Sequence, residues 1–471
     1  MHKYKRLLNN SLLFSVGYLG SKFIVFLMLP LYTAQMLPSE YGIADVITTT
    51  AVLLLPVVSL SVFDGVLRFT MDSGFDPLEV FSNSVRITRV GAIAVLLSTP
   101  VIFYFSHPFA VLPLLLVLQS YQTLYTQFAK GINRIRLFAM NGVLLTALTA
   151  VLNVVFLAVL KMGLSGYFLA LCLGLAVSNL ALFFRLDLRN MYSRNQLSWS
   201  YTRKILKFSL PLIPNSIAWN VSYVVGKFVI MIFLGSYANG MFAVASKIPA
   251  LLTTLTGIFS QSWELSAIEE FTHRDSESDT FFNRIYKGYI AVLFVGASFI
   301  IIFTKPLLSF LVDPRYFSAW KFIPILLISA VFSSLSSFLG SQYIAAKQTV
   351  QIFKTTVLGS SVSILLIFLL IKILGINAVS TSTFVGFFII WAIRHKDIAN
   401  KMGSDVTFKG ILIQLVLLFM QYRVTFIKQN IVCYFAQIGI ALLLLFMNRK
   451  IIIDLFVSLS DAIRRRRKSD N

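Results

Sequence analysis

Apolar stretches long enough to cross a bilayer follow one another from residue 10 to at least residue 394. A membrane-spanning helix needs about 20 mainly apolar residues, and no interval between these stretches is long enough for a soluble domain. Only 13% of the residues are charged, which is roughly half the share in soluble domains. The pattern predicts an all-α integral membrane protein.

Twelve spans are expected, with two weaker stretches at 408–427 and 430–447 that would raise the total from 12 to 14. The first stretch is too long for a cleavable signal sequence and lacks a small-residue cleavage site, so we interpret it as a permanent span. With the amino terminus inside, most of the 41 lysines and arginines fall in cytoplasmic segments. The positive-inside rule therefore predicts a protein of the cell membrane with both termini cytoplasmic. The approximate bounds of the twelve spans are 10–33, 43–67, 87–105, 109–129, 138–160, 163–184, 208–234, 240–263, 288–304, 322–343, 355–372 and 375–393.

The sequence contains an internal repeat. A shift of 198 residues aligns Tyr41-Gly42-Ile43 with Asn239-Gly240-Met241, and a shift of 205 residues aligns the first span with the seventh. Six helices per half is an even number, so both halves have the same orientation, and in transporters of this plan the substrate site lies between the repeats. We predict two six-helix lobes, 1–195 and 196–400, followed by an extra hairpin and a basic cytoplasmic tail at 401–471.

One face of the repeated span is polar. Its residues are spaced by four, three and four positions, which places them on one stripe of a helix. A lysine at the centre of a span costs about 2.5 to 3.5 kcal/mol, so the two lysines are expected to face a wet cavity or an acidic partner. The two copies of the stripe are Ser11, Ser15, Tyr18 and Lys22 in the first span, and Ser216, Asn220, Tyr223 and Lys227 in the seventh.

Two interpretations of these lysines are open. In one, they pair with acidic residues on neighbouring helices and only hold the bundle together; in the other, they attract an anionic ligand. The second is favoured because Asp64 and Arg68, four residues apart, should satisfy each other as a structural pair, while Lys247 adds a third cation, although it could snorkel to the outer surface. The acids that could neutralise the lysines are Asp45, Asp64 and Glu264.

Several kinds of chemistry have no support in the sequence. The glycine-rich loops of P-loop and dinucleotide sites are missing, and the histidines, including His395, are predicted to be isolated loop residues without metal-ligand spacing. Both cysteines lie within predicted spans. The net charge of +22 is scattered among short loops, which does not fit nucleic acid. We therefore expect no catalytic residue, no metal, no cofactor and no nucleic-acid partner.

Short motifs along the chain, taken together, resemble the oligosaccharide (polysaccharide repeat-unit) flippases, or Wzx-like proteins, of the superfamily that includes MATE exporters and lipid II flippases. The resemblance covers at least residues 8–400. It implies a MATE-like two-lobed fold with a central cationic cavity, and an undecaprenyl-diphosphate-linked oligosaccharide as cargo. The motifs are Leu29-Pro30-Leu31-Tyr32, Ser39-Glu40-Tyr41-Gly42, Gln127 to Gly131 leading to Phe138, Asn153 to Leu157, and Gly166-Tyr167.

The functional hypothesis is a flippase that works by alternating access for capsule, exopolysaccharide or O-antigen-type biosynthesis. Lys22 and Lys227, with Lys247, would attract the diphosphate, and the serine, asparagine and tyrosine side chains of the stripes would contact sugars. Membrane lipids and other polysaccharide assembly proteins are the further expected partners. The alternatives are a lipid II flippase, a MATE-type exporter of small molecules and, less favoured because no sizeable outer loop is present, a membrane-embedded polysaccharide polymerase.

Overall fold

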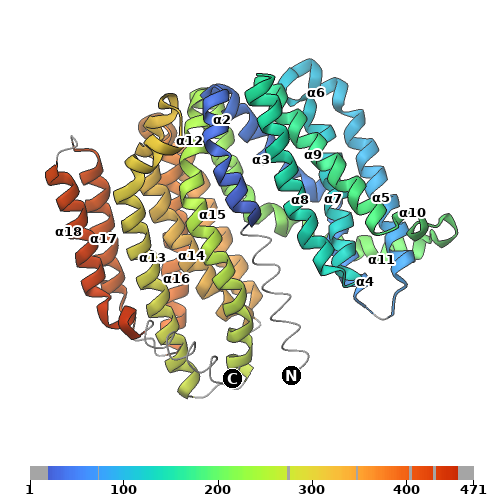
Figure 1. Ribbon diagram of the computed structural model, residues 1–471. Helices are drawn as coiled ribbons and strands as arrows, with labels where there is room; N and C mark the ends of the chain where they lie inside the picture. Colours follow the sequence, from blue (N-terminus) through green and yellow to red (C-terminus); the bar gives the residue numbers. More distant parts are fainter. Residues whose placement is uncertain are drawn as a thin grey trace, which may run out of the picture. The chain divides into compact units, whose positions relative to one another are not determined.

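The apolar stretches form α-helices in the computed structural model, which describes residues 20–72, 74–272, 276–345, 348–402, 406–427 and 431–454 (Figure 1). Within these ranges eleven helices are long and apolar enough to cross a membrane, and Val432–Met447 is a shorter apolar helix. The prediction of an all-α membrane protein with 12 to 14 spans is confirmed. The first predicted span, 10–33, lies partly outside the described residues.

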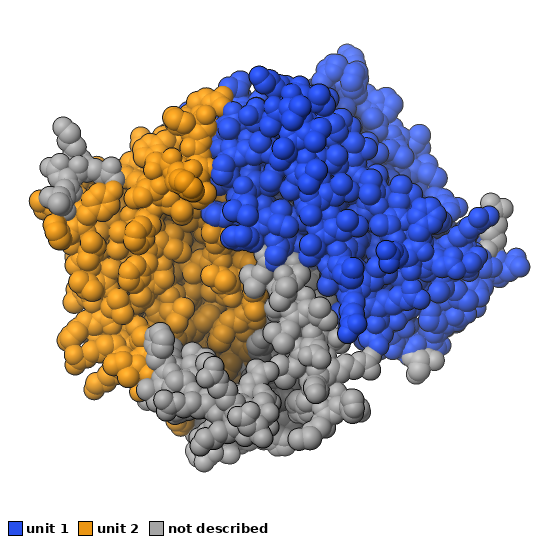
Figure 2. Space-filling model, viewed as in Figure 1, with its two compact units in different colours: residues 1–243 blue, residues 244–471 orange. Residues whose placement is uncertain are grey.

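The chain divides into two compact units, residues 1–243 and residues 244–471, coloured separately in Figure 2. The boundary falls inside α12, and the division into lobes at 195 and 400 stays a prediction. Unit 1 contains α2 (Leu29–Gln35), α3 (Pro38–Val58), α4 (Val62–Thr70), α5 (Pro77–Leu97), α6 (Thr99–Phe105), α7 (Leu112–Gly131), α8 (Ile135–Asn153), α9 (Gly163–Arg185), α10 (Leu188–Met191), α11 (Trp199–Ser209) and the start of α12 (Leu212–Thr272).

The second predicted span, 43–67, is wrong as a single helix. It begins earlier, at Pro38, and is interrupted after Val58, where Leu60 and Ser61 adopt left-handed backbone angles (φ 51° and 50°) before α4 begins. Pro56 lies inside α3 just before the break, and it has no N–H to donate to the carbonyl of Val52, so it weakens the last turns of the helix. The left-handed conformation costs roughly 1 to 2 kcal/mol per non-glycine residue, so the surrounding packing must hold this turn.

α12 merges the seventh and eighth predicted spans. Gly235, with φ 84° and ψ 175°, is its one non-helical residue, and the positive φ is one that glycine adopts without steric cost. The break matches the predicted gap between spans 208–234 and 240–263. Both segments that flank Gly235 contact α3.

The crossing of α12 with α3 depends on two glycines. A Cβ atom built on Gly42 would lie 2.0 Å from the carbonyl oxygen of Ser236, and one built on Gly240 would lie 1.9 Å from that of Pro38. Gly42 and Gly240 are the two positions that the 198-residue shift makes equivalent. The equivalent residues of the repeat therefore meet each other with their backbones in direct contact.

Four motif residues that carried the family resemblance gather at one end of unit 1. The Asn153 amide donates to the Tyr32 hydroxyl at 3.2 Å, and the Tyr32 ring lies against the rings of Tyr41 and Tyr167, with centroids 6.2 and 5.4 Å apart. Tyr41 is buried. The residues come from α2, α3, α8 and α9, so these motifs hold four helices of unit 1 together.

Unit 2 is a helical bundle with an aromatic interior. The Phe338 ring lies at the centre of this interior and stacks on Trp263, Tyr286 and Tyr289, with ring centroids 4.9 to 5.3 Å apart. The predicted hairpin at 408–447 is present as α17 and α18, which contact α13. Besides the end of α12, unit 2 contains α13 (Ser276–Leu311), α14 (Ile323–Ala345), α15 (Thr349–Leu374), α16 (Asn377–Met402), α17 (Phe408–Thr425) and α18 (Ile431–Met447).

We expect Gly42→Ala and Gly240→Ala each to destabilise the protein, because the new methyl group would have to displace backbone atoms. Overpacking of this kind typically costs about 1 to 3 kcal/mol. The measurement is the midpoint of thermal unfolding of the detergent-solubilised protein. Gly142→Ala on α8 is the matched control, since no atom lies within 4 Å of its added Cβ, and it should leave the midpoint unchanged or higher. Equal midpoints for all three variants would contradict a tight crossing.

Candidate functional site

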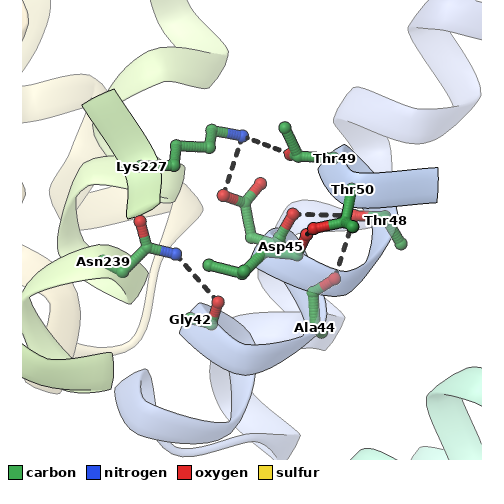
Figure 3. A network of polar contacts seen from close by, with 9 residues as sticks. Gly42, Ala44, Asp45, Thr48, Thr49, Thr50, Lys227 and Asn239 are labelled. Atoms are coloured by element: carbon green, nitrogen blue, oxygen red, sulfur yellow. Dashed lines mark hydrogen bonds and ion pairs between the residues drawn. The ribbon is translucent and has the colours of Figure 1, made fainter. Parts of the chain in front are cut away.

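The Lys227 ammonium group lies between α12 and α3 and is almost fully buried. Its Nζ atom is 2.8 Å from Asp45 Oδ2, and the two side chains are 3% and 10% exposed. Nζ also donates to the hydroxyl oxygen of Thr49 at 2.9 Å (Figure 3). It lies 4.3 Å from the centroid of the Tyr223 ring. The carboxylate, the hydroxyl and the ring together surround a cation that has three N–H donors.

Helix periodicity explains why these groups meet. Asp45 and Thr49 are one turn apart on α3, and Tyr223 and Lys227 are one turn apart on α12, so each pair shares a helix face. The neighbouring hydroxyls of Thr48 and Thr50 donate to carbonyls of their own helix, at 2.9 and 2.7 Å from Ala44 and Val46. Of the three consecutive threonines, Thr49 is the one that faces Lys227 (Figure 3).

A second polar contact ties the same helices together beside the ion pair. The Asn239 amide, fully buried, donates to the carbonyl oxygen of Gly42 at 2.8 Å. Asn239 lies next to Gly240, so the close glycine crossing positions its side chain against the α3 backbone. Along the chain, Lys227 precedes the break at Gly235 and Asn239 follows it. Both segments of α12 are therefore fastened to α3.

The structure selects a partner for Lys227 and gives the two lysines of the repeat different surroundings. Lys227 pairs with Asp45, as the interpretation in terms of neighbouring acids predicts. Its counterpart Lys22, on the helical segment 20–27, is exposed. Equivalent positions in the sequence therefore have different environments.

The other predicted site residues are distributed as follows. Tyr223 is 41% exposed, and Ser216 and Lys247 are partly buried on α12. Asn220 and Glu264 also lie on α12, but their side chains are outside the described part of the chain. Ser11, Ser15 and Tyr18 fall outside the described residues altogether.

The predicted pairing of Arg68 with Asp64 is wrong. Arg68 Nη1 lies 3.4 Å from Asp72 Oδ2, one turn further along the chain, and both side chains are substantially exposed. The pair therefore lies at the end of α4, near water, where it contributes about 0.3 to 0.5 kcal/mol. Asp64 is partly buried on the first turn of α4.

Sequence reasoning missed a buried cation in unit 2. Arg394 is 2% exposed and donates to the Ser336 carbonyl at 2.7 Å and to the hydroxyls of Thr355 and Thr356, both at 3.0 Å. It thereby joins α14, α15 and α16. The residue follows directly on the predicted span 375–393, where a basic residue is ordinary, so hydropathy gave no signal of its burial.

His395 is also not the isolated loop residue that the sequence suggested. It is 4% exposed within α16. Its Nδ1 atom lies 3.2 Å from the Tyr286 hydroxyl, which in turn accepts a hydrogen bond from Trp391 Nε1 at 3.0 Å. His395 therefore belongs to the aromatic interior of unit 2.

The chain is similar in fold, but not in sequence, to proteins of known structure. No protein-family model and no curated protein matches the sequence. The lipid II flippase MurJ, in an inward closed conformation, aligns with a TM-score of 0.70 at 16% identity, over 96% of this chain and 100% of that one. An inward-facing multidrug resistance MATE family transporter of the MOP superfamily aligns with a TM-score of 0.66 at 14% identity, over 83% and 96%.

A third solved structure with this fold is a MOP superfamily transporter from Pyrococcus furiosus, described as having a binding pocket of reversed polarity. It aligns with a TM-score of 0.59 at 12% identity, over 83% of this chain and 95% of that one. The chain is therefore a multi-pass membrane protein with the fold shared by MATE transporters and MurJ.

We expect Lys227→Met and Asp45→Asn each to lower the stability of the protein substantially, because each leaves one buried group without its partner. Breaking a buried ion pair from one side typically costs about 3 to 5 kcal/mol. Thermal unfolding of the purified variants measures the effect. The double variant should recover much of the loss, since neither charge remains buried.

Lys247→Met removes an equal charge from the same helix and serves as the control, with a small expected effect. If the double variant were as unstable as the sum of the two single variants, the pair would not be coupled, and the contact between Lys227 and Asp45 would have no energetic role.

Proposed function

We propose that this protein is a transporter rather than an enzyme, and that it moves a lipid-linked anionic oligosaccharide between the leaflets of the cell membrane by alternating access. Solved structures with the same fold include a lipid II flippase and a multidrug resistance MATE family transporter. The proposed cargo is an undecaprenyl-diphosphate-linked repeat unit for capsule, exopolysaccharide or O-antigen-type biosynthesis. The direction is from the cytoplasmic to the outer leaflet.

The observation that carries the proposal is the buried ammonium of Lys227. A lysine in a membrane-spanning helix is expensive and usually marks a substrate or ion pathway. Within the described part of the chain the Asp45 carboxylate is its one ion-pair partner, and Tyr223, one turn away, is 41% exposed. A diphosphate that entered beside Tyr223 would compete with Asp45 for the same ammonium group.

Competition of this kind would couple cargo binding to a conformational change. When Lys227 is paired with Asp45, α12 is tied to α3; when it binds a phosphate, that tie is released. A ligand shifts a conformational equilibrium only by its difference in affinity for the two states. The exchange of partners by Lys227 provides such a difference, because only the unpaired state offers the ammonium to the cargo.

Other polar groups on α12 support recognition of a sugar-bearing anion. Lys247 adds a second positive charge, while Ser216 and Tyr223 carry hydroxyls suited to sugars. Lys22 is exposed and is proposed to attract the diphosphate before it reaches Lys227. The polyprenyl tail would stay in lipid throughout.

The membrane potential can drive the proposed movement. An anion that moves outward, away from a negative interior, gains about 2.3 kcal/mol per charge for each 100 mV. A diphosphate carries more than one negative charge, so net outward flux needs no further energy source. Proton or sodium coupling would appear as a dependence of the rate on the corresponding ion gradient.

A lipid II flippase is the second candidate function. The alignment with MurJ includes 96% of this chain, against 83% for the MATE transporter. A small-molecule MATE exporter of cationic compounds is disfavoured, because such cargo would prefer acidic groups where Lys22, Lys227 and Lys247 stand. Growth rescue of cells depleted of their own lipid II flippase would favour the second candidate over the first.

The test is complementation of a strain that lacks its own repeat-unit flippase. Wild-type protein should restore surface polysaccharide. Lys22→Ala combined with Lys227→Met in an Asp45→Asn background should reach the membrane at a normal level, because no unpaired buried charge remains at Asp45, and should restore less than about a tenth of the polysaccharide. Losing one charge-assisted hydrogen bond of about 1.5 to 3 kcal/mol is enough for such an effect.

Lys227→Arg is the control, since it keeps the charge and should retain most activity. Asp45→Asn alone leaves the Lys227 ammonium group unpaired, so it tests whether transport requires the carboxylate only when it is compared with the wild type at an equal membrane level. Normal polysaccharide from the charge-free variant would show that the lysines do not receive the cargo, and the cationic-site proposal would then be wrong.

A further inference from the structure

A pocket of about 730 Å³ opens on unit 1 between the start of α8 and the end of α9. Its lining contains three arginines, Arg134, Arg136 and Arg185, and no acidic residue. All three arginines are exposed, and none has a carboxylate partner within the described part of the chain. Lys227 does not line this pocket, and the three arginines have no role in the proposed transport.

Further along α8 from Arg134 and Arg136, the pocket has an apolar wall on an exposed side of the helix. Met140 and Leu144 line it and are 68% and 44% exposed. α8 is the least buried of the eleven candidate spans, with only 11% of its apolar window inside the protein. In a bilayer this wall would face hydrocarbon, and the arginines, at the end of the span, would lie at the level of the lipid headgroups.

A buried donor without a partner lies between these two zones. Asn141 lines the pocket and is 3% exposed. Its Oδ1 atom accepts a hydrogen bond from Ser178, whereas its Nδ2 group has no hydrogen-bond partner among the described residues. A buried amide donor left unpaired costs about 1 to 3 kcal/mol, so a ligand acceptor at this depth would be stabilising.

We propose that this pocket binds one anionic phospholipid of the adjacent leaflet. The order of groups along α8 matches the order of groups in a phospholipid: Arg136 for the phosphate, Asn141 for an ester carbonyl and Leu144 for the acyl chain. At 1.5 Å per residue these positions lie about 7 and 12 Å beyond Arg136 along the helix. The first turn of α8 also presents unpaired backbone N–H groups, which favour an anion.

Arg134 has a separate structural role at the rim. Its guanidinium donates to the Arg185 carbonyl oxygen at 2.9 Å and so closes the end of α9. The two arginines available for the headgroup are therefore Arg136 and Arg185, one from each helix. A phosphate between them would join α8 to α9 at this end.

Native mass spectrometry of the full-length protein in detergent, titrated with phosphatidylglycerol, tests the proposal. The wild type should retain one phosphatidylglycerol and no phosphatidylcholine at equal concentration. Arg136→Gln with Arg185→Gln should weaken binding about 30-fold, which corresponds to about 1 kcal/mol for each arginine near an anionic headgroup. Leu144→Trp, which narrows the apolar wall and keeps all three arginines, should also reduce retention.

The matched control is Arg203→Gln with Lys207→Gln, which removes the same charge from exposed positions on α11 and should leave retention unchanged. Equal loss in the control would mean unspecific attraction, and equal retention of phosphatidylcholine would mean that charge is irrelevant; either result overturns the proposal. Binding of inorganic phosphate alone with the same affinity would also overturn the proposal, because it would assign the pocket to free phosphate. Displacement of the lipid by polyprenyl phosphate at equimolar concentration would overturn it as well, because it would assign the pocket to the cargo.

Discussion

The ion pair between Lys227 and Asp45 is the interaction on which the arrangement of α12 and α3 depends. A charge inside the bilayer must be paired or must face water, so one carboxylate at 2.8 Å decides which face of α12 meets α3. The glycines at the same crossing allow that approach, because their backbones touch where any side chain would collide. Asn239 completes the contact from the far side of the break at Gly235. The crossing thus combines close backbone packing with a buried polar contact that a competing anion could exchange.

The internal repeat explains why these groups meet. Gly42 and Gly240 occupy equivalent positions of the two copies, and they contact each other directly. Lys22 and Lys227 are equivalent in sequence as well, yet Lys22 is exposed and Lys227 is buried. An acid corresponding to Asp45 is missing from the second copy, where the 198-residue shift places Ala243. The two copies therefore share the glycine crossing but differ in their charges.

Much of the fold could be predicted from the sequence, because a bilayer forces apolar helices of a narrow length range. The break between α3 and α4 could not, since hydropathy is continuous across residues 59–61 and only Pro56 marks the place. Three acids were possible partners for Lys227, and only the three-dimensional packing selects Asp45. Arg394 was missed for a different reason: an arginine at the end of a span has the same sequence pattern whether it points to water or, as here, into a layer of threonines and carbonyls.

Recognition of a lipid-linked anion is the central property of the proposed transporter. It is tested most directly by measuring the transfer of a polyprenyl-diphosphate oligosaccharide across sealed vesicles that contain only the purified protein. The fraction of sugar that a membrane-impermeant reagent reaches is followed with time, beside a neutral glycolipid bearing the same sugar. The account predicts rapid transfer of the diphosphate lipid, accelerated by a potential that is positive on the receiving side, and little transfer of the neutral one. Equal transfer of both lipids, or no transfer of either in vesicles that contain folded protein, would contradict it.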